Sequence, residues 1–324
     1  MAFANSNFND VFTTTLKNRT GKIADNVTNN NTLLSMLSKK GNIMLEDGGQ
    51  TLVQELDFAE NSTFKYYSGW EVLDVNQSDV ISAAEFDWKQ AAVSVVCSGL
   101  ELRQNAGKNR IINLMAAKIK NAENSMANNL STGIFSDGTG SGGKQIGGLS
   151  LIVADDPTTG TVGGINRANY SFWRNISYDA SSDGGAAATS ANIQDYMNAV
   201  TIQLVRGSDG VDIIVGDNNY FNLFWQSLQA IQRITDTSKG TSGFRSLEYN
   251  GPNGGAQVLL DNAAGANHMY FLNTDFLFWK VHKDANYSVS DDVQSSNQDG
   301  IAKKILFMGN LTASNCSLQG VLKA

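Results

Sequence analysis

The residues of this chain that most invite a chemical interpretation are the glycines within residues 135–149, FSDGTGSGGKQIGGL. Gly138, Gly140 and Gly143 have the GxGxxG spacing of a dinucleotide-binding loop, and Lys144 nearly completes a phosphate-binding P-loop. Both kinds of loop hold phosphate oxygens with backbone N–H groups where a helix begins. A nucleotide-binding enzyme that uses this loop is therefore one hypothesis to weigh.

The surroundings of the loop argue against nucleotide binding. A dinucleotide loop follows a strand and opens a helix. This loop follows an expected helix and leads into residues 146–149, where we expect no helix to begin. Gln145 also occupies the position where a P-loop needs Ser or Thr to bind magnesium. Because glycine adopts positive φ at no steric cost, we interpret the loop as a structural turn and expect no cofactor.

Other residues with catalytic or metal-binding potential are few. His268 and His282 are the only histidines, and neither belongs to HExxH or accompanies GxSxG. Cys97 and Cys316 lack CxxC spacing and are too few for a structural zinc site. We therefore expect no catalytic residues, no metal site and no enzyme.

Acidic residues slightly outnumber basic ones. The formal net charge of the 324-residue chain is −7, and no basic tail is present, which argues against tight electrostatic binding of nucleic acid. The adjacent carboxylates at 155–156 and 291–292 are expected to point to opposite faces of extended segments, so they do not suit paired acid–base chemistry. No export signal and no apolar run long enough for a membrane span are visible.

The first half of the chain predicts an appendage, a β region and a long helix. Residues 1–45 are polar and Asn-rich, so we expect them to lie along a neighbouring surface, with a short helix at 32–37. Residues 46–97 are expected to form a long two-stranded excursion with aromatic residues at its middle. Residues 109–130 are the strongest helix candidate, with Gly133 as its expected C-cap. The apolar stripe of this helix is formed by Ile111, Met115, Ile119, Ala122, Met126 and Leu130.

The second half predicts an α/β region after a low-complexity break at 181–188, which is the best internal boundary. A helical stripe is formed by Ile193, Met197, Val200 and Leu204, and a second helix over 220–231 is opened by Asp217. The expected strands cover residues 211–215, 257–260, 269–272, 276–281, 304–308 and 318–322.

The turn after the long helix resembles that of tailed-bacteriophage major capsid proteins of the Hong Kong 97 type. In that family a spine helix ends in a "GDGTG…GL"-like turn, and residues 136–140 (SDGTG) with Gly148 and Leu149 match it apart from Ser136 at the first position. An N-terminal arm, a β excursion, the spine helix and an α/β segment also occur in the family's order. The resemblance implies a mixed α+β, Hong Kong 97-like capsid fold with a spine helix, a long β-sheet, an extended N-arm and an E-loop.

The resemblance also implies a division of the chain. The N-terminal arm and short helix take residues 1–45, the E-loop hairpin 46–97, the peripheral domain with the spine helix 98–190, the axial α/β domain 191–303, and C-terminal strands that return to the peripheral domain 304–324.

The function implied by the resemblance is self-assembly into hexamers and pentamers of an icosahedral shell around packaged double-stranded DNA. The expected partners are other copies of the chain, a portal, a separate scaffold protein and optionally a decoration protein, without sequence-specific DNA binding or a membrane. The protein would be made in the host cytoplasm and reside in the virion. Within the same fold, an encapsulin-like cellular compartment is the alternative.

Two groups of residues are expected to matter for such a shell. The predicted assembly contacts are Phe8, Phe12, Phe64, Lys65, Tyr66, Tyr67 and Trp70. The predicted structural turn comprises Asp137, Gly138, Thr139, Gly140, Gly148 and Leu149. Some shells of this type cross-link such a Lys to an Asn of a neighbour, but no Asn partner for Lys65 can be aligned, and a solvated Lys is the simpler interpretation.

Overall fold

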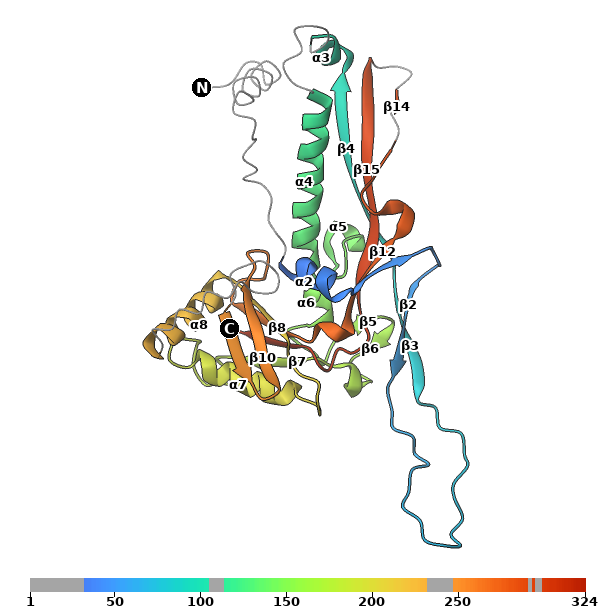
Figure 1. Ribbon diagram of the computed structural model, residues 1–324, viewed down its shortest axis with the longest axis vertical. Helices are drawn as coiled ribbons and strands as arrows, with labels where there is room; N and C mark the ends of the chain where they lie inside the picture. Colours follow the sequence, from blue (N-terminus) through green and yellow to red (C-terminus); the bar gives the residue numbers. More distant parts are fainter. Residues whose placement is uncertain (1–31, 105–113, 232–246, 291–292, 295–298) are drawn as a thin grey trace. The chain divides into compact units, whose positions relative to one another are not determined.

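The computed structural model describes residues 32–104, 114–231, 247–290, 293–294 and 299–324 (Figure 1). The predictions made for Phe8, Phe12 and Ile111 lie outside these residues. The chain divides into two compact units. The first contains residues 90–131 and 283–308, and the second contains 31–89, 132–282 and 309–324. The long helix α4 (Leu114–Ile134) and the long strand β15 (Gly300–Ala313) contribute residues to both.

The first unit contains most of α4 and a set of strands that pair with β15. These strands are β4 (Lys89–Ser98), β13 (Ser288–Val289) and β14 (Val293–Gln294), and the short helix α3 (Gly99–Gln104) follows β4. Along α4 the stripe members Ala122, Met126 and Leu130 are buried. The predicted spine helix is therefore confirmed over its described residues.

The second unit is built around a six-stranded mixed sheet. Its strand order is β7 (Ile176–Asp179), β16 (Gly320–Lys323), β11 (His268–Leu272), β8 (Ile213–Gly216), β10 (Gly254–Leu260) and β9 (Leu247–Gly251). Helices α7 (Ile193–Leu204) and α8 (Asn218–Ile231) pack on this sheet (Figure 1). The core between them is apolar, and it includes Met197, Val200, Phe224, Ile214, Val258 and Phe271.

Local sequence explains why these helices form where they do. The predicted stripe Ile193, Met197, Val200 and Leu204 is fully buried along α7. The carboxylate of Asp217 accepts a hydrogen bond of 2.9 Å from the backbone N–H of Tyr220, which caps the first turn of α8. Both helix predictions are confirmed.

The rest of the second unit consists of shorter elements. Helix α2 (Thr32–Lys40) leads into β1 (Ile43–Glu46), which pairs in parallel with β12 (Leu277–His282), and β12 pairs antiparallel with the end of β15. The two-stranded hairpin of β2 (Leu52–Asp57) and β3 (Ile81–Phe86) stands apart from both sheets. The remaining elements are α5 (Gly140–Gly143), α6 (Leu149–Ile152), β5 (Thr161–Val162), β6 (Ile165–Asn166) and single 3-10 turns at Ser171–Trp173, Thr274–Phe276 and Lys283–Ala285.

The β excursion and the tail differ from their predictions. The paired part of the hairpin ends at Phe86, and β4 pairs with β15 instead of continuing it. The tail contributes to two sheets, because β16 pairs with β11 and β7 in the sheet of the α/β segment. Strand β7 precedes the expected boundary near residue 190 yet joins the same sheet. Sequence patterns find strands but not their partners, since pairing is decided by contacts between distant segments.

The helix before the glycine loop also ends later than predicted. Gly133 is not its C-cap, because α4 continues through Ile134, whose side chain is fully buried. The chain leaves the helix through hydrogen bonds from Phe135 N to Thr132 O and from Ser136 N to Gly133 O. Burial of Ile134 thus extends the helix by one residue past the glycine.

Candidate functional site

The glycine loop is a turn held by its own side chains. The Asp137 carboxylate accepts hydrogen bonds from the backbone N–H of Thr139 at 3.0 Å and from its hydroxyl at 2.8 Å. These bonds, led by the backbone one, lower the pKa of Asp137. The Ser136 Oγ lies 2.7 Å from both Gly133 O and Ile146 O, so its single hydroxyl proton is shared between the two ends of the loop. Ser136 thereby has a specific role at the position where the family pattern has Gly.

Two glycines of the loop are required by its geometry. Gly138 has a φ of +77°, which residues with a side chain rarely adopt. At Gly148 a Cβ atom would lie 2.2 Å from Ile134 O, so only glycine fits beside the end of α4. The next residue, Leu149, is fully buried and begins α6. The expectation that residues 146–149 open nothing helical was therefore wrong, since one turn of helix starts there to bury Leu149 and Ile152.

Three backbone donors of the loop are already used within it. Gly143 N donates to Thr139 O, Gln145 N donates to Gly140 O, and Thr139 N donates to Asp137. The Asp137 carboxylate would also repel a phosphate group. Lys144 is exposed, and the lysine that does contact the loop is Lys89, whose Nζ donates to Gly143 O at 2.8 Å. The geometry therefore suits a structural turn better than a phosphate-binding loop.

The hairpin β2–β3 ends in a long loop with exposed aromatic residues. The ladder stops at the bond from Phe58 N to Val80 O, and residues 59–79 continue from it without a strand (Figure 1). The exposed fractions at its tip are 75% for Phe64, 91% for Tyr66, 62% for Tyr67 and 103% for Trp70. Val72 and Val75 are also exposed, at 86% and 93%. So many exposed apolar side chains in one loop are unusual on a protein that remains a monomer.

Lys65 lies within this aromatic group. Its Nζ atom donates to the backbone oxygen of Val72 on the other side of the loop. Lys65 thus joins the two sides of the loop tip within one chain.

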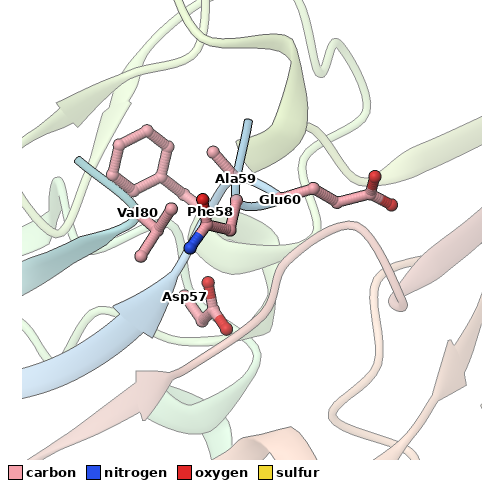
Figure 2. A pocket seen from close by; sticks show the side chains of 6 residues that line it. Asp57, Phe58, Ala59, Glu60 and Val80 are labelled. Carbon is pink, nitrogen blue, oxygen red and sulfur yellow. The ribbon is translucent and has the colours of Figure 1, made fainter. Parts of the chain in front are cut away.

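An open hollow of about 470 Å³ lies where the β2–β3 ladder passes into the loop. It is lined by Asp57, Phe58, Ala59, Glu60, Asn61 and Val80. Figure 2 shows the carboxylates of Asp57 and Glu60 directed away from each other, so they do not form a paired acid–base site. The Phe58 ring is stacked on Phe172 with centroids 5.4 Å apart. The described part of the chain also holds no cluster of three or more residues suited to a metal ion.

The two histidines contact an aspartate and a tryptophan, and both cysteines are buried. His268 binds Asp155, with 3.0 Å between Nε2 and Oδ2, and the ring of His282 lies 5.7 Å from that of Trp88. Cys97 and Cys316 are both fully buried, and burial raises the pKa of the Cys316 thiol to about 11. A buried thiol of this kind is neutral and a poor nucleophile. Asp291 and Asp292 lie outside the described residues.

Comparisons with known proteins give matches in structure only. No protein-family model matches the sequence, and no curated protein matches it. The capsid asymmetric unit of Cyanophage A-1(L) superposes with a TM-score of 0.65 and 12% identity, over 93% of this chain and 94% of that chain. The capsid of Myoviridae phage XM1 gives a TM-score of 0.52 and 10% identity, over 89% and 91%.

These matches cover nearly the whole length of both chains. The chain has the Hong Kong 97-like fold of tailed-phage major capsid proteins. The same fold is found in the holo-SrpI encapsulin complex from Synechococcus elongatus PCC 7942, with a TM-score of 0.54, 7% identity, and coverage of 100% of this chain and 96% of that chain. The predicted fold class is therefore confirmed. In addition, none of the described helices combines the length and apolarity needed to cross a membrane.

The sequence did not reveal what holds the hairpin in place. Lys280 on β12 and Asn310 on β15 are buried polar residues, 6% and 3% exposed. Lys280 Nζ donates to Val53 O on β2 at 2.8 Å, and Asn310 Nδ2 donates to Asp87 O, just after β3, at 2.9 Å. The only sequence signal was a polar residue within each of two apolar strands.

Proposed function

We propose that this chain is the major capsid protein of a tailed phage. It assembles into hexamers and pentamers that close into an icosahedral shell around double-stranded DNA. The observation that carries the proposal is the group of exposed aromatic residues at the tip of the hairpin loop, on a chain with this fold. The proposed shell surfaces also include Phe8 and Phe12 of the N-terminal arm.

The exposed aromatic residues need a partner surface. Phe64, Tyr66, Tyr67 and Trp70 are each at least 62% exposed in the single chain. Burying an aromatic side chain removes roughly 150–250 Å² from water, which makes such residues dominant in interfaces. A neighbouring copy offers the same partner at every position of a closed symmetric shell. The hairpin loop is therefore the surface through which one subunit holds the next.

The other proposed partners follow from a shell of this kind. The chain joins a portal and a separate scaffold protein, and a decoration protein can bind the outer surface. The net charge of −7 suits a wall that encloses DNA without binding it tightly. The proposed location is the virion capsid, after synthesis in the host cytoplasm.

An encapsulin-like compartment is the second candidate, because the SrpI encapsulin has the same fold. The two candidates differ in contents, since an encapsulin-like shell would enclose protein cargo and a capsid would enclose DNA. A nucleotide-binding enzyme is disfavoured because the amides of Thr139, Gly143 and Gln145 are bonded within the glycine loop.

Electron microscopy of the purified protein, alone and with a phage scaffold protein, tests the proposal. We expect capsomers or closed icosahedral shells. Particles from infected cells should contain nuclease-protected DNA, whereas enzyme cargo without DNA would favour the compartment. A protein that remains monomeric at every concentration, with the scaffold present, would refute assembly.

A further inference from the structure

The root of the hairpin is the end of the β2–β3 ladder where β2 begins and β3 stops. Two residues that face each other across one strand pair hold this root. Lys280 on β12 and Asn310 on β15 are direct partners in the antiparallel register. Lys280 holds the backbone of β2 at Val53, and Asn310 holds the backbone at Asp87, where β3 has ended. One cross-strand pair therefore holds both strands of the hairpin.

Asn310 connects the hairpin root to the glycine loop as well. Its Oδ1 accepts hydrogen bonds of 3.0 Å from Gly147 N and from Leu311 N, while its Nδ2 donates to Asp87 O. One buried amide side chain thus joins the turn after the spine helix to the end of β3. A displacement of either segment would break a bond to the same side chain.

Lys280 is unusual because its charge is buried. Its Nζ lies 3.5 Å from Glu46 Oε1, and the side chain is 8% exposed. Burial of a lysine in a strand costs free energy that an apolar residue of similar volume would not. In addition to the ion pair with β1, the charge gives a strong hydrogen bond to Val53 O. The bonds of Lys280 to Glu46 and Val53 therefore fix the position of β2 relative to β1 and β12.

The chain next to the root contains two glycines and a tryptophan contact. Gly48 and Gly49 lie between β1 and β2, with φ values of +145° and +118°. Trp88 Nε1 donates to Gly49 O at 3.0 Å and closes the root from the other side. Farther along the hairpin, Glu85 N donates to Gly163 O in the β5–β6 turn.

We propose that Lys280 and Asn310 act as positioning residues that set the direction in which the hairpin leaves the subunit. This inference rests on the proposed shell function, because the direction of the hairpin decides where its aromatic tip meets the next copy. By linking the hairpin to the turn after the spine helix, Asn310 makes the curvature of the shell depend on that turn. Loss of either residue leaves the subunit folded and the hairpin poorly directed.

The direction of the hairpin can be measured in the unassembled full-length protein. Spin labels are placed by Glu60→Cys at the start of the hairpin loop and Gln203→Cys on α7, both exposed positions. The native Cys97 and Cys316 are fully buried and should not react. Pulsed electron paramagnetic resonance then measures the distribution of distances between the two spin labels. The variants are Lys280→Met and Asn310→Leu, which remove the bonds at similar side-chain volume.

The matched control is Lys89→Met, which also removes a lysine-to-carbonyl hydrogen bond, to Gly143 O, but holds neither hairpin strand. Hydrogen bonds to charged groups are the stronger ones, so loss of the Lys280 bond should raise the population of displaced hairpins about tenfold or more. We expect one narrow distance peak in the parent and the control, and a broad distribution in both variants. Parent-like distributions in both folded variants would overturn the proposal, as would a broad distribution in the parent.

A further variant separates the two roles of Asn310 and also serves if Lys280→Met does not fold. Asn310→Asp retains the acceptor for Gly147 N and removes the donor to Asp87 O. We expect it to release the hairpin while leaving the glycine loop protected from hydrogen exchange. Electron microscopy should then show shells of altered size or open sheets. If the parent forms no shell at all, the proposed function fails, and the distance measurement still decides whether the pair directs the hairpin.

Discussion

His268 Nε2 lies 3.0 Å from Asp155 Oδ2, and this pair joins the start of strand β11 to the segment that follows α6. The second ring nitrogen of His268 lies 2.7 Å from Ala266 O, which places a donor at Nδ1. The hydrogen bond to Asp155 raises the pKa of His268, with burial opposing it, and the same bond lowers the pKa of Asp155. The charge of Lys323 also lowers the pKa of Asp155, and the charge of Asp217 also raises the pKa of His268.

The signs of these shifts predict a stability maximum at mildly acidic pH. The raised pKa of His268 gives stability that is present below its ordinary value of 6.5 and lost as pH rises through its folded value. The lowered pKa of Asp155 gives stability that is present above its ordinary value of 3.8 and lost as pH falls through its folded value. The pair therefore stabilises most between the two ordinary values. Thermal unfolding of unassembled protein should show a lower Tm at about pH 8 than at about pH 5.5.

The control for this pH dependence is His268→Gln, which keeps a hydrogen-bonding side chain but cannot be protonated. We expect the difference in Tm between the two pH values to shrink in this variant. An unchanged difference would show that other groups cause the pH dependence.

A second prediction concerns the closest approach in the glycine loop. Gly148→Ala would place Cβ 2.2 Å from Ile134 O, a backbone atom that cannot move aside without bending the end of α4. Overpacking of this kind costs about 1–3 kcal/mol in the free energy of unfolding. Gly142→Ala is the matched control, since nothing lies within 4 Å of its Cβ position and only its φ of +68° adds strain. Chemical denaturation should show a clearly larger loss for Gly148→Ala, and equal losses would contradict the close approach.

The glycine loop also allows a direct test against nucleotide binding. Lys144 is exposed, so Lys144→Ala should leave assembly unchanged, and calorimetry should detect no ATP binding to the parent. Lys89→Ala, which removes the hydrogen bond from Lys89 to Gly143 O, is the comparison variant for Lys144→Ala in both measurements. Saturable ATP binding that disappears in Lys144→Ala would reverse the ranking in favour of an enzyme.

The parts that could be predicted from the sequence are those that local pattern determines. The buried stripe on α7 and the Asp217 cap on α8 depend on residues three or four positions apart, so the sequence alone indicates them. The turn at Asp137 and Thr139 is equally local. The family resemblance supplied the order of the elements, which no single motif determines.

The parts that could not be predicted depend on partners far apart in the chain. Lys280 contacts Val53 across 227 positions and Asn310 contacts Asp87 across 223, so neither spacing suggests a role for these residues. For the same reason the pairing of β16 with β7 was missed, because β7 lies about 140 positions earlier. Ile134 extends α4 past Gly133 because tertiary burial outweighs a local helix-ending signal.

The last prediction concerns the tip of the hairpin loop. Deletion of residues 61–70 removes Phe64, Tyr66, Tyr67 and Trp70, all of which are at least 62% exposed, so the subunit core loses nothing. The ladder bond from Phe58 N to Val80 O lies outside the deletion and closes the shortened hairpin. We expect a circular dichroism spectrum and a Tm close to those of the parent. Assembly should stop at monomers or isolated capsomers, because the surface that holds the next copy is absent.

Single substitutions distinguish the aromatic residues from the length of the loop. Trp70→Ser and Tyr66→Ser each remove one exposed ring, and each should slow shell closure without changing Tm. Asn76→Ser changes the same loop without affecting an aromatic residue and should assemble like the parent. Unfolded deletion protein would mean that the rings belong to the core, and intact shells from it would mean that the tip does not contribute to assembly. Because the rings are solvent-exposed in the single chain, their contribution must appear only when a second copy covers them.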